Sequence, residues 1–110
     1  HTPGLTKLEC CKNRLAKLDL SHTPGLTELE CSENDFTELD LSHTPGLTKL
    51  QCWDNPLTEL DLSHTPGLRI LWCAGNQLEE LDIRNNPTLK ICEVGDGVKI
   101  IKHDWRLRDE

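Results

Sequence analysis

The sequence is poor in aromatic residues, in basic residues and in long apolar runs. Aromatic residues make up only 4% of it, which is little for the core of a 110-residue globular protein. Lysine and arginine number 12 against 19 aspartates and glutamates, so the formal charge is −7. Nucleic acids and anionic membrane surfaces require a basic face, so neither is expected as a partner. No apolar run approaches the roughly 20 residues that span a bilayer, so membrane insertion is not expected either.

The chain instead consists of short tandem repeats. The string HTPGL begins at His1, His22, His43 and His64, and the residues between these points are similar from copy to copy. A fifth copy keeps the proline and the following leucine but departs elsewhere. We therefore predict four full repeats over residues 1–84, followed by a degenerate fifth repeat and a polar C-terminal cap over residues 85–110.

Each full copy carries the pattern L-x-x-L-x-C-x-x-N-x-L, with phenylalanine at the last position of the second copy. In the third copy the pattern runs from Leu47 through Leu50, Cys52 and Asn55 to Leu57. The sequence thereby resembles the leucine-rich repeat family, whose periods are about 20–29 residues. Its L-D-L-S segments resemble repeats of surface and secreted proteins of Bacteroidetes bacteria.

The resemblance implies a leucine-rich repeat solenoid. This is a right-handed coil with one parallel β-sheet on its concave face, short extended segments opposite and little or no α-helix. Alternation within each copy predicts a strand over residues 7–11 and its equivalents, and an extended segment over residues 18–21 and its equivalents. The Thr-Pro-Gly-Leu segments suit type II turns in which Gly25, Gly46 and Gly67 adopt a positive φ.

Rows of polar residues recur at fixed positions of the repeat. The asparagine row is expected to bond the turn backbone through its amides. The aspartate row is expected to accept backbone or serine hydrogen bonds, with a cation site as the alternative. The histidines of the next row are interpreted as turn residues, and the alternatives are a pH-sensitive row or metal ligands. The first members of these rows are Asn13, Asp19 and His1.

Six cysteines could form disulfides or zinc sites, but their spacing opposes both. Cys10, Cys31, Cys52 and Cys73 occupy one inward position in successive copies, so their thiols form a line. Parallel Cβ vectors disfavour a bridge, and four thiols in a line cannot surround a zinc ion. We expect reduced, buried thiols at these positions and at the inward position of the last copy, with Cys11 exposed; no metal or cofactor is expected.

Charge alternates between the first two copies. The basic residues Lys7, Lys12, Arg14 and Lys17 each have an acidic residue at the same position of the second copy, which predicts opposite charges on neighbouring rungs. A role in fixing the register is favoured over a merely solvated surface. At the N-terminal end, the leucines of the first copy are expected to lie uncovered. We therefore expect an excerpt of a longer array, or self-association through this end.

The outward positions of the expected sheet differ most between copies, and there the resemblance implies that partners bind. Two tryptophans fall on adjacent rungs about 8 Å apart, close enough for their rings to touch. Alternatively, the tail folds over part of this surface as a small second core; Trp105 is expected to cover the C-terminal end. The predicted binding residues are Trp53, Trp72, Ile70, Ile91, Gln51 and Glu30.

No catalytic motif is recognisable, and ladders of carboxylates and histidines lack the convergent geometry that acid–base catalysis needs. We therefore predict a non-enzymatic module that binds a protein or carbohydrate through its concave face. A structural spacer or self-assembling array without a dedicated ligand is the alternative. From the family resemblance alone, the protein is expected outside the cell or on its surface.

Overall fold

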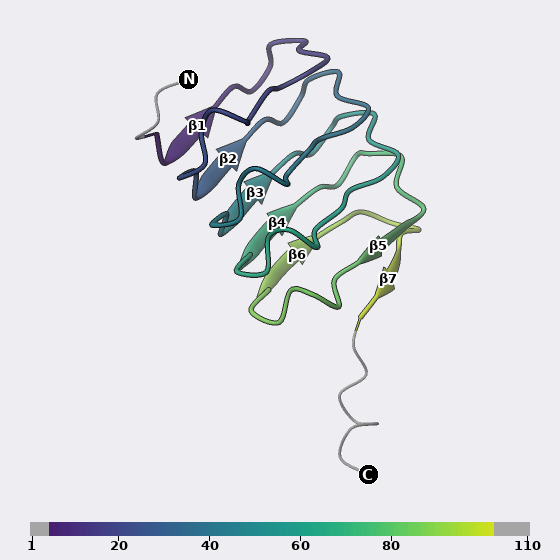
Figure 1. Ribbon diagram of the computed structural model, residues 1–110. Helices are drawn as coiled ribbons and strands as arrows, with labels where there is room; N and C mark the ends of the chain where they lie inside the picture. Colours follow the sequence, from purple (N-terminus) through teal and green to yellow (C-terminus); the bar gives the residue numbers. More distant parts are fainter. Residues whose placement is uncertain (1–4, 103–110) are drawn as a thin grey trace.

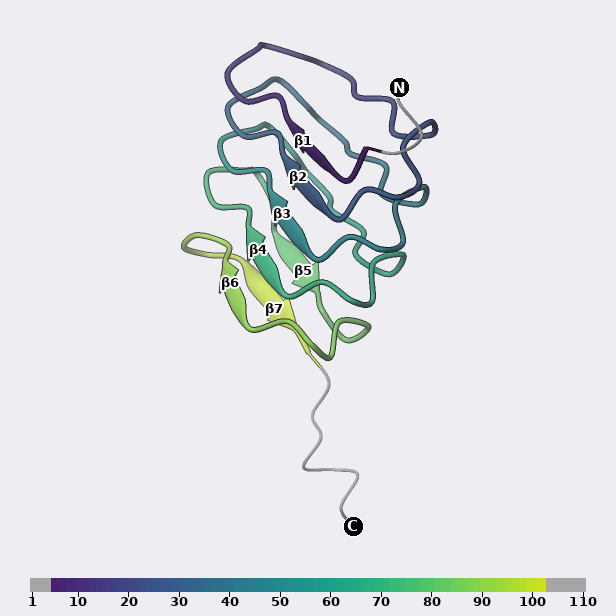
Figure 2. The ribbon, with the colours of Figure 1, turned by 90° about the vertical axis from the view of Figure 1, so that its left-hand side faces the viewer.

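The structure, a computed structural model, describes residues 5–102, except for the side chain of Ile91. Five short strands lie side by side along one side of the molecule and form a parallel sheet in the order β1-β2-β3-β4-β6 (Figure 1). Strands β5 and β7 pair in parallel on the opposite side of the coil (Figure 1), so they overlap the large sheet when it faces the viewer (Figure 2). The strand bounds are β1 Lys7–Glu9, β2 Glu28–Glu30, β3 Lys49–Gln51, β4 Ile70–Trp72, β5 Glu80–Asp82, β6 Ile91–Glu93 and β7 Lys99–Ile101.

This arrangement confirms the solenoid of parallel strands. Leu29 pairs with Leu50 and Leu50 with Leu71, so residues one repeat period apart are neighbours in the large sheet. Each strand is three residues long, which is shorter than the predicted strand over residues 7–11 and its equivalents. The small sheet pairs Leu81 with Ile100, an offset of 19, so the fifth turn is shorter than the turns before it.

The extended segment predicted opposite the sheet forms a paired strand only in the fourth and fifth turns, among residues 5–102. None of these residues is helical, so they contain no helix that could cross a membrane. The division into repeats over 1–84 and a cap over 85–110 stays a prediction.

A continuous apolar core runs through the coil between the two sheets. In the second to fourth turns the inward leucines, the ladder cysteines and Phe36 lie at or near complete burial. Full burial of one such leucine contributes about 1.5–3 kcal/mol, so stacking the turns supplies the main stabilising term. The fully buried members include Leu26, Leu29, Leu47, Leu50, Leu57, Leu68 and Leu71.

The predicted type II turns are wrong. Gly25, Gly46 and Gly67 are not among the residues with positive φ. The N–H of Thr23 donates to Leu20 O, and the N–H of Leu26 donates to Thr23 O, each at 3.2 Å. Two consecutive β-turns therefore share Thr23. The second β-turn has proline at its second position and needs no residue with positive φ, as is typical of a type I turn.

The asparagine row bonds backbone groups of its own turn, as predicted, and also bonds neighbouring turns of the coil together. The side-chain Oδ1 of Asn34 accepts the N–H groups of Asn13 and Leu15 in the preceding turn, each at 3.0 Å. Its Nδ2 donates at 2.9 Å to the carbonyls of Cys10 and Cys31. Asn34 and Asn55 are buried, so their amides satisfy backbone groups that are largely shielded from water.

The aspartate row accepts the hydrogen bonds expected of it. Asp40 Oδ1 accepts the N–H of Ser42 at 2.9 Å and its hydroxyl at 2.6 Å, and the first and third copies repeat this geometry. In the fourth copy Arg84 takes the serine position and binds Asp82 through its guanidinium at 2.8 Å. His43 Nε2 lies 4.0 Å from Asp40 Oδ2. Each carboxylate therefore has a local structural partner.

The cysteines of residues 5–102 are free thiols, as predicted. Cys31, Cys52 and Cys73 are fully buried, which confirms the inward position of the ladder. Cys10 begins the same ladder but is only half-buried, because it lies in the first described turn of the coil.

Two further cysteine expectations are wrong. Cys92 occupies the inward position opposite Leu71 but is exposed, because it lies on the last strand of the large sheet. Cys11 is half-buried rather than exposed, and its sulfur lies 4.0 Å from a carboxylate oxygen of Glu30.

The charge rows of the first two turns form, but few of their members make ion pairs. Lys7 is opposite Glu28 in the register, yet its Nζ contacts Glu9 of its own strand at 3.3 Å. Lys12 and Glu33 are the one cross-turn pair of this set within 4.0 Å among residues 5–102, at 3.9 Å. Exposed pairs of this kind contribute about 0–1 kcal/mol, so their role in setting the register stays a prediction.

Candidate functional site

The outer face of the large sheet is built from the first and third residue of each strand, because the central residue points into the core. Along the third position, Gln51 of β3 is paired with Trp72 of β4, and Trp72 with Glu93 of β6. Immediately after the strands, Trp53 precedes the loop of the third turn. The two tryptophans of this face therefore come from the third and fourth turns.

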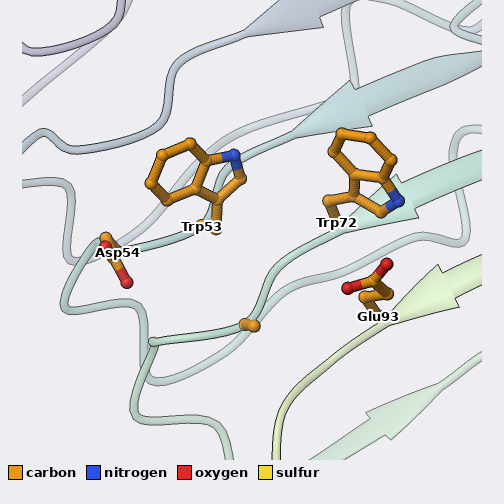
Figure 3. Close-up of a pocket in the computed structure, with 5 residues that line it drawn as sticks. Trp53, Asp54, Trp72 and Glu93 are labelled. Atoms are coloured by element: carbon orange, nitrogen blue, oxygen red, sulfur yellow. The ribbon is translucent and has the colours of Figure 1, made fainter.

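A pocket of about 390 Å³ opens on this face where β3, β4 and β6 end (Figure 3). Both tryptophans are half-buried, and Figure 3 shows their rings standing apart, with open space between them in this view. Both rings belong to the wall of the same pocket. The lining residues are Trp53, Asp54, Trp72, Ala74 and Glu93.

Backbone hydrogen bonds hold the third-turn wall in place. The N–H of Trp53 donates to the hydroxyl of Ser32 in the preceding turn at 3.2 Å, and its carbonyl accepts the N–H of Glu33 at 2.9 Å. The N–H of Asp54 donates to Ala74 O at 2.9 Å. Ser32 is fully buried, so the wall begins from a fixed point in the core.

A left-handed backbone residue places the acidic side chain at one edge of the pocket. Asp54 has φ 57°, and its equivalent one turn later is Gly75, with φ 76°. A side chain at Gly75 would place its Cβ on the Asp54 carboxylate and 3.2 Å from the Asp54 backbone nitrogen. Glycine adopts this conformation without strain and leaves the space that the Asp54 carboxylate occupies.

Trp72 carries a buried polar atom without a hydrogen-bond partner. Its indole Nε1 is inaccessible to solvent and unpaired. Figure 3 shows this nitrogen on the side of the ring away from Trp53. The pocket wall is therefore made by the carbon side of the ring, and an unsatisfied donor of this kind costs about 1–3 kcal/mol.

Comparison with known proteins agrees with the repeat geometry. A family model described as Leucine Rich repeats (2 copies) matches residues 45–92. The chain also matches a solved structure from Listeria monocytogenes, described as the functional domain of InlJ, which includes a cysteine ladder. The identity is 43% over 93% of this chain, with a TM-score of 0.81.

This chain belongs to the leucine-rich repeat family. It spans 23% of the length of the InlJ structure that it matches. No curated protein gives a significant match. The resemblance to Bacteroidetes repeats stays a prediction. Leucine-rich repeat proteins generally bind protein partners, and they use extended concave surfaces for it.

The predicted binding residues of this leucine-rich repeat chain do not all lie together. Trp53 and Trp72 share the pocket, whereas Gln51 is buried, with 7% exposure. Glu30 is half-buried one strand further away, opposite Gln51 in the register. Ile70 lines a separate hollow of about 330 Å³. That hollow is lined by Glu28, Thr48, Lys49, Arg69, Ile70 and Lys90.

Sequence reasoning did not select Asp54, Ala74 and Glu93. The signal for two of them was available, because Ala74 occupies the repeat position of Trp53 one copy later, and Glu93 that of Trp72. Asp54 was harder to place, since its position depends on a left-handed φ. The expectations for Trp105 and for a tail folding over the sheet lie outside the described residues.

Nothing in the described part points to a metal centre. Among residues 5–102, no group of three or more histidine, cysteine, aspartate or glutamate side chains is arranged to hold a metal ion. A large acidic hollow of about 800 Å³ lies on the side of β5, away from the tryptophans. Its acidic lining residues are Glu59, Asp61, Glu79, Glu80 and Asp82.

Proposed function

We propose that this chain is a non-enzymatic interaction module whose partner, a protein or a glycan, docks on the outer face of the large sheet. The observation that carries this proposal is the pocket between Trp53 and Trp72. Aromatic residues are scarce in this chain, yet two of the four are half-buried and line one pocket on the surface that the family uses for binding. Half-exposed tryptophans beside charged residues are typical of binding hot spots.

The test compares the wild-type chain with Trp53→Ala and Trp72→Ala on a printed array of glycans and of short peptides. We expect the wild type to bind a subset of spots, and each alanine variant to lose at least about tenfold in affinity for them. Thr58→Ala, in the hollow on the β5 side, is the control and should bind like the wild type.

Trp72→Phe is a second informative variant, because it keeps an aromatic wall and removes the unpaired Nε1–H. It should retain most of the binding and lose little stability. If both alanine variants bind like the wild type, or if they unfold while Trp72→Phe also fails to bind, the pocket is part of the core and the proposal is wrong.

By family resemblance we also propose that the protein acts outside the cell or on its surface. The structural match from Listeria monocytogenes is a leucine-rich repeat protein and supports a bacterial origin. Immunolabelling of intact, unpermeabilised cells of the source organism tests this placement: surface labelling supports it, and labelling only after permeabilisation contradicts it.

A further inference from the structure

The chemistry of the Trp53–Trp72 pocket goes further than a general binding surface. Its lining offers two indole rings and two acidic side chains, Asp54 and Glu93, with only Ala74 besides. No lysine, arginine or histidine is among these residues. The pocket therefore combines aromatic surface with negative charge and holds no internal counter-ion among its lining side chains.

Both acidic groups are free to meet a ligand. Asp54 and Glu93 are exposed, and neither side chain takes part in an ion pair shorter than 4.0 Å among residues 5–102. They come from different turns, one after β3 and the other from β6, so they approach the pocket from separate rungs (Figure 3). In this view Glu93 lies beside Trp72, whereas Asp54 lies on the side of Trp53 away from Trp72, so the two carboxylates mark opposite ends of the pocket.

The basic side chains of this face are kept apart from the pocket. The other hollow lies where the strands begin, not where they end. Its basic lining residues are Lys49, Arg69 and Lys90. The two hollows therefore differ in charge. A partner with a cation at the strand ends matches this pattern, and a partner with an anion there does not.

Aromatic faces attract cations through the ring quadrupole, and carboxylates add charge-assisted hydrogen bonds. A guanidinium uses both better than an ammonium, because it is planar, stacks on indole rings and presents five donors in a fixed plane. A neutral sugar can stack on the same rings but gains nothing from the net charge of the pocket. Sugar hydroxyls can donate to the two carboxylates, but a neutral ligand leaves their charge uncompensated, whereas a cation neutralises it.

We infer that the pocket between Trp53 and Trp72 binds an arginine side chain of a protein partner. This inference rests on the proposed function, since it names the chemical group that the outer face of the sheet recognises. The guanidinium lies between the two rings, Glu93 beside Trp72 accepts its hydrogen bonds, and Asp54 at the other end of the pocket adds negative charge.

The test uses acetyl-arginine amide, with acetyl-citrulline amide as a neutral probe of almost the same shape and the corresponding lysine amide as a second cation. The indole N–H signals of ¹⁵N-labelled protein are followed by NMR while each probe is added up to 100 mM. We expect the arginine probe to shift the signals of Trp53 and Trp72 in a saturable way. The citrulline probe should bind at least fivefold more weakly, and the lysine probe should also bind more weakly than arginine.

Charge-removing variants assign the effect to the pocket. Glu93→Gln and Asp54→Asn should each weaken the arginine probe about two- to fivefold. Glu59→Gln removes the same charge on the opposite side and should leave the affinity unchanged within error. Raising the salt from 20 to 500 mM should weaken binding of the arginine probe to the wild type more than to a variant with both Glu93→Gln and Asp54→Asn, because salt screens the charge attraction.

Several results would overturn the inference. The first is the absence of a saturable shift with the arginine probe. The second is an affinity for the citrulline or the lysine probe equal to that for the arginine probe. The third is a loss of affinity in Glu59→Gln as large as that in Glu93→Gln. The array experiment separates the two levels of the argument. Tryptophan-dependent binding of neutral peptides or glycans, without arginine binding, would leave the proposed function standing and refute the arginine pocket.

Discussion

At the scale of single residues, one backbone position in each turn determines how the chain leaves the sheet. Lys12, Glu33 and Asp54 hold left-handed φ values of 60°, 59° and 57°, and the fourth member of this row is glycine. Residues other than glycine lose about 1–2 kcal/mol in this conformation. The row was not predictable from three of the four copies, because lysine, glutamate and aspartate give no hint of it. Gly75 was its one sequence signal.

Replacing Lys12 with glycine should stabilise the fold relative to replacing it with alanine. Both changes remove the exposed side chain and its 3.9 Å contact with Glu33, so their difference isolates the backbone conformation. We expect the free energy of unfolding to be about 1 kcal/mol higher for Lys12→Gly than for Lys12→Ala, measured by urea denaturation. Equal stability of the two variants would show that the left-handed conformation is absent in solution.

The stability lost when an asparagine of the row is replaced should depend strongly on its position in the stack. Asn34→Ala removes five bonds to buried or half-buried backbone groups of two turns, so it should cost about 3 kcal/mol or more. Asn13→Ala is the matched control, because the side chain of exposed Asn13 donates within its own turn, to Cys10 O. It should cost about 1 kcal/mol or less. Similar losses for both variants in thermal or urea unfolding would contradict the bridging role.

Acid should weaken the fold through the aspartate row. The hydroxyl and N–H of Ser42 lower the pKa of Asp40, and hydrogen bonds from Arg84 lower the pKa of Asp82 to about 2. A carboxyl whose pKa is lower in the folded state stabilises the fold above its unfolded value, about 4, and this contribution disappears as the pH falls towards 2.

The variant with both Asp40→Asn and Asp82→Asn should therefore lose less stability than the wild type between pH 5 and pH 2. Urea midpoints at each pH measure this, and Glu59→Gln controls for the loss of a carboxylate outside the row. Parallel pH profiles for the wild type and the double variant would refute the argument.

At the scale of elements, the strands were predictable and the turns were not. Strand positions follow from the alternation around Leu29 and its equivalents, which burial on one face requires. The turn around Pro24 and Gly25 has a sequence that suits both type I and type II geometry. The structure has a further hydrogen bond here, from the N–H of Thr23 to Leu20 O. The choice between the two geometries depends on this bond, which the sequence alone does not show.

The position of each cysteine along the stack of strands predicts its reactivity. Burial raises the pKa of the Cys73 thiol to about 12 and also raises the pKa values of Cys31 and Cys52, so few thiolates form there at neutral pH. Exposed Cys92 should react first with Ellman's reagent in the native protein, and Cys31, Cys52 and Cys73 should react only on unfolding.

Reaction in denaturant should release all six thiols, and Cys92→Ser should remove the fastest native phase. Recovery of fewer thiols from the denatured, unreduced protein would reveal disulfides and contradict the free cysteine ladder. Fast native reaction of Cys52, which is fully buried, would contradict the position of the core.

At the scale of the whole molecule, the repeat places the binding surface but does not define its chemistry. The register predicted that Trp53 and Trp72 would lie on neighbouring rungs, and they share one pocket. It did not predict that Gln51 would be buried or that Ile70 would line another hollow, because side-chain size and rotamers decide these contacts. Of the two acidic pocket residues, Glu93 follows from the register, whereas Asp54 required the loop geometry in addition.

The most direct test of the stacked coil is the pattern of nuclear Overhauser effects between its neighbouring strands. Neighbouring parallel strands lie about 4.8 Å apart, so residues separated by one repeat period should give contacts throughout the large sheet. We predict them between Leu29 and Leu50 and between Trp72 and Glu93, as the strand pairing requires. Their absence, or a register displaced by one residue, would contradict both the stacked coil and the pocket built on it.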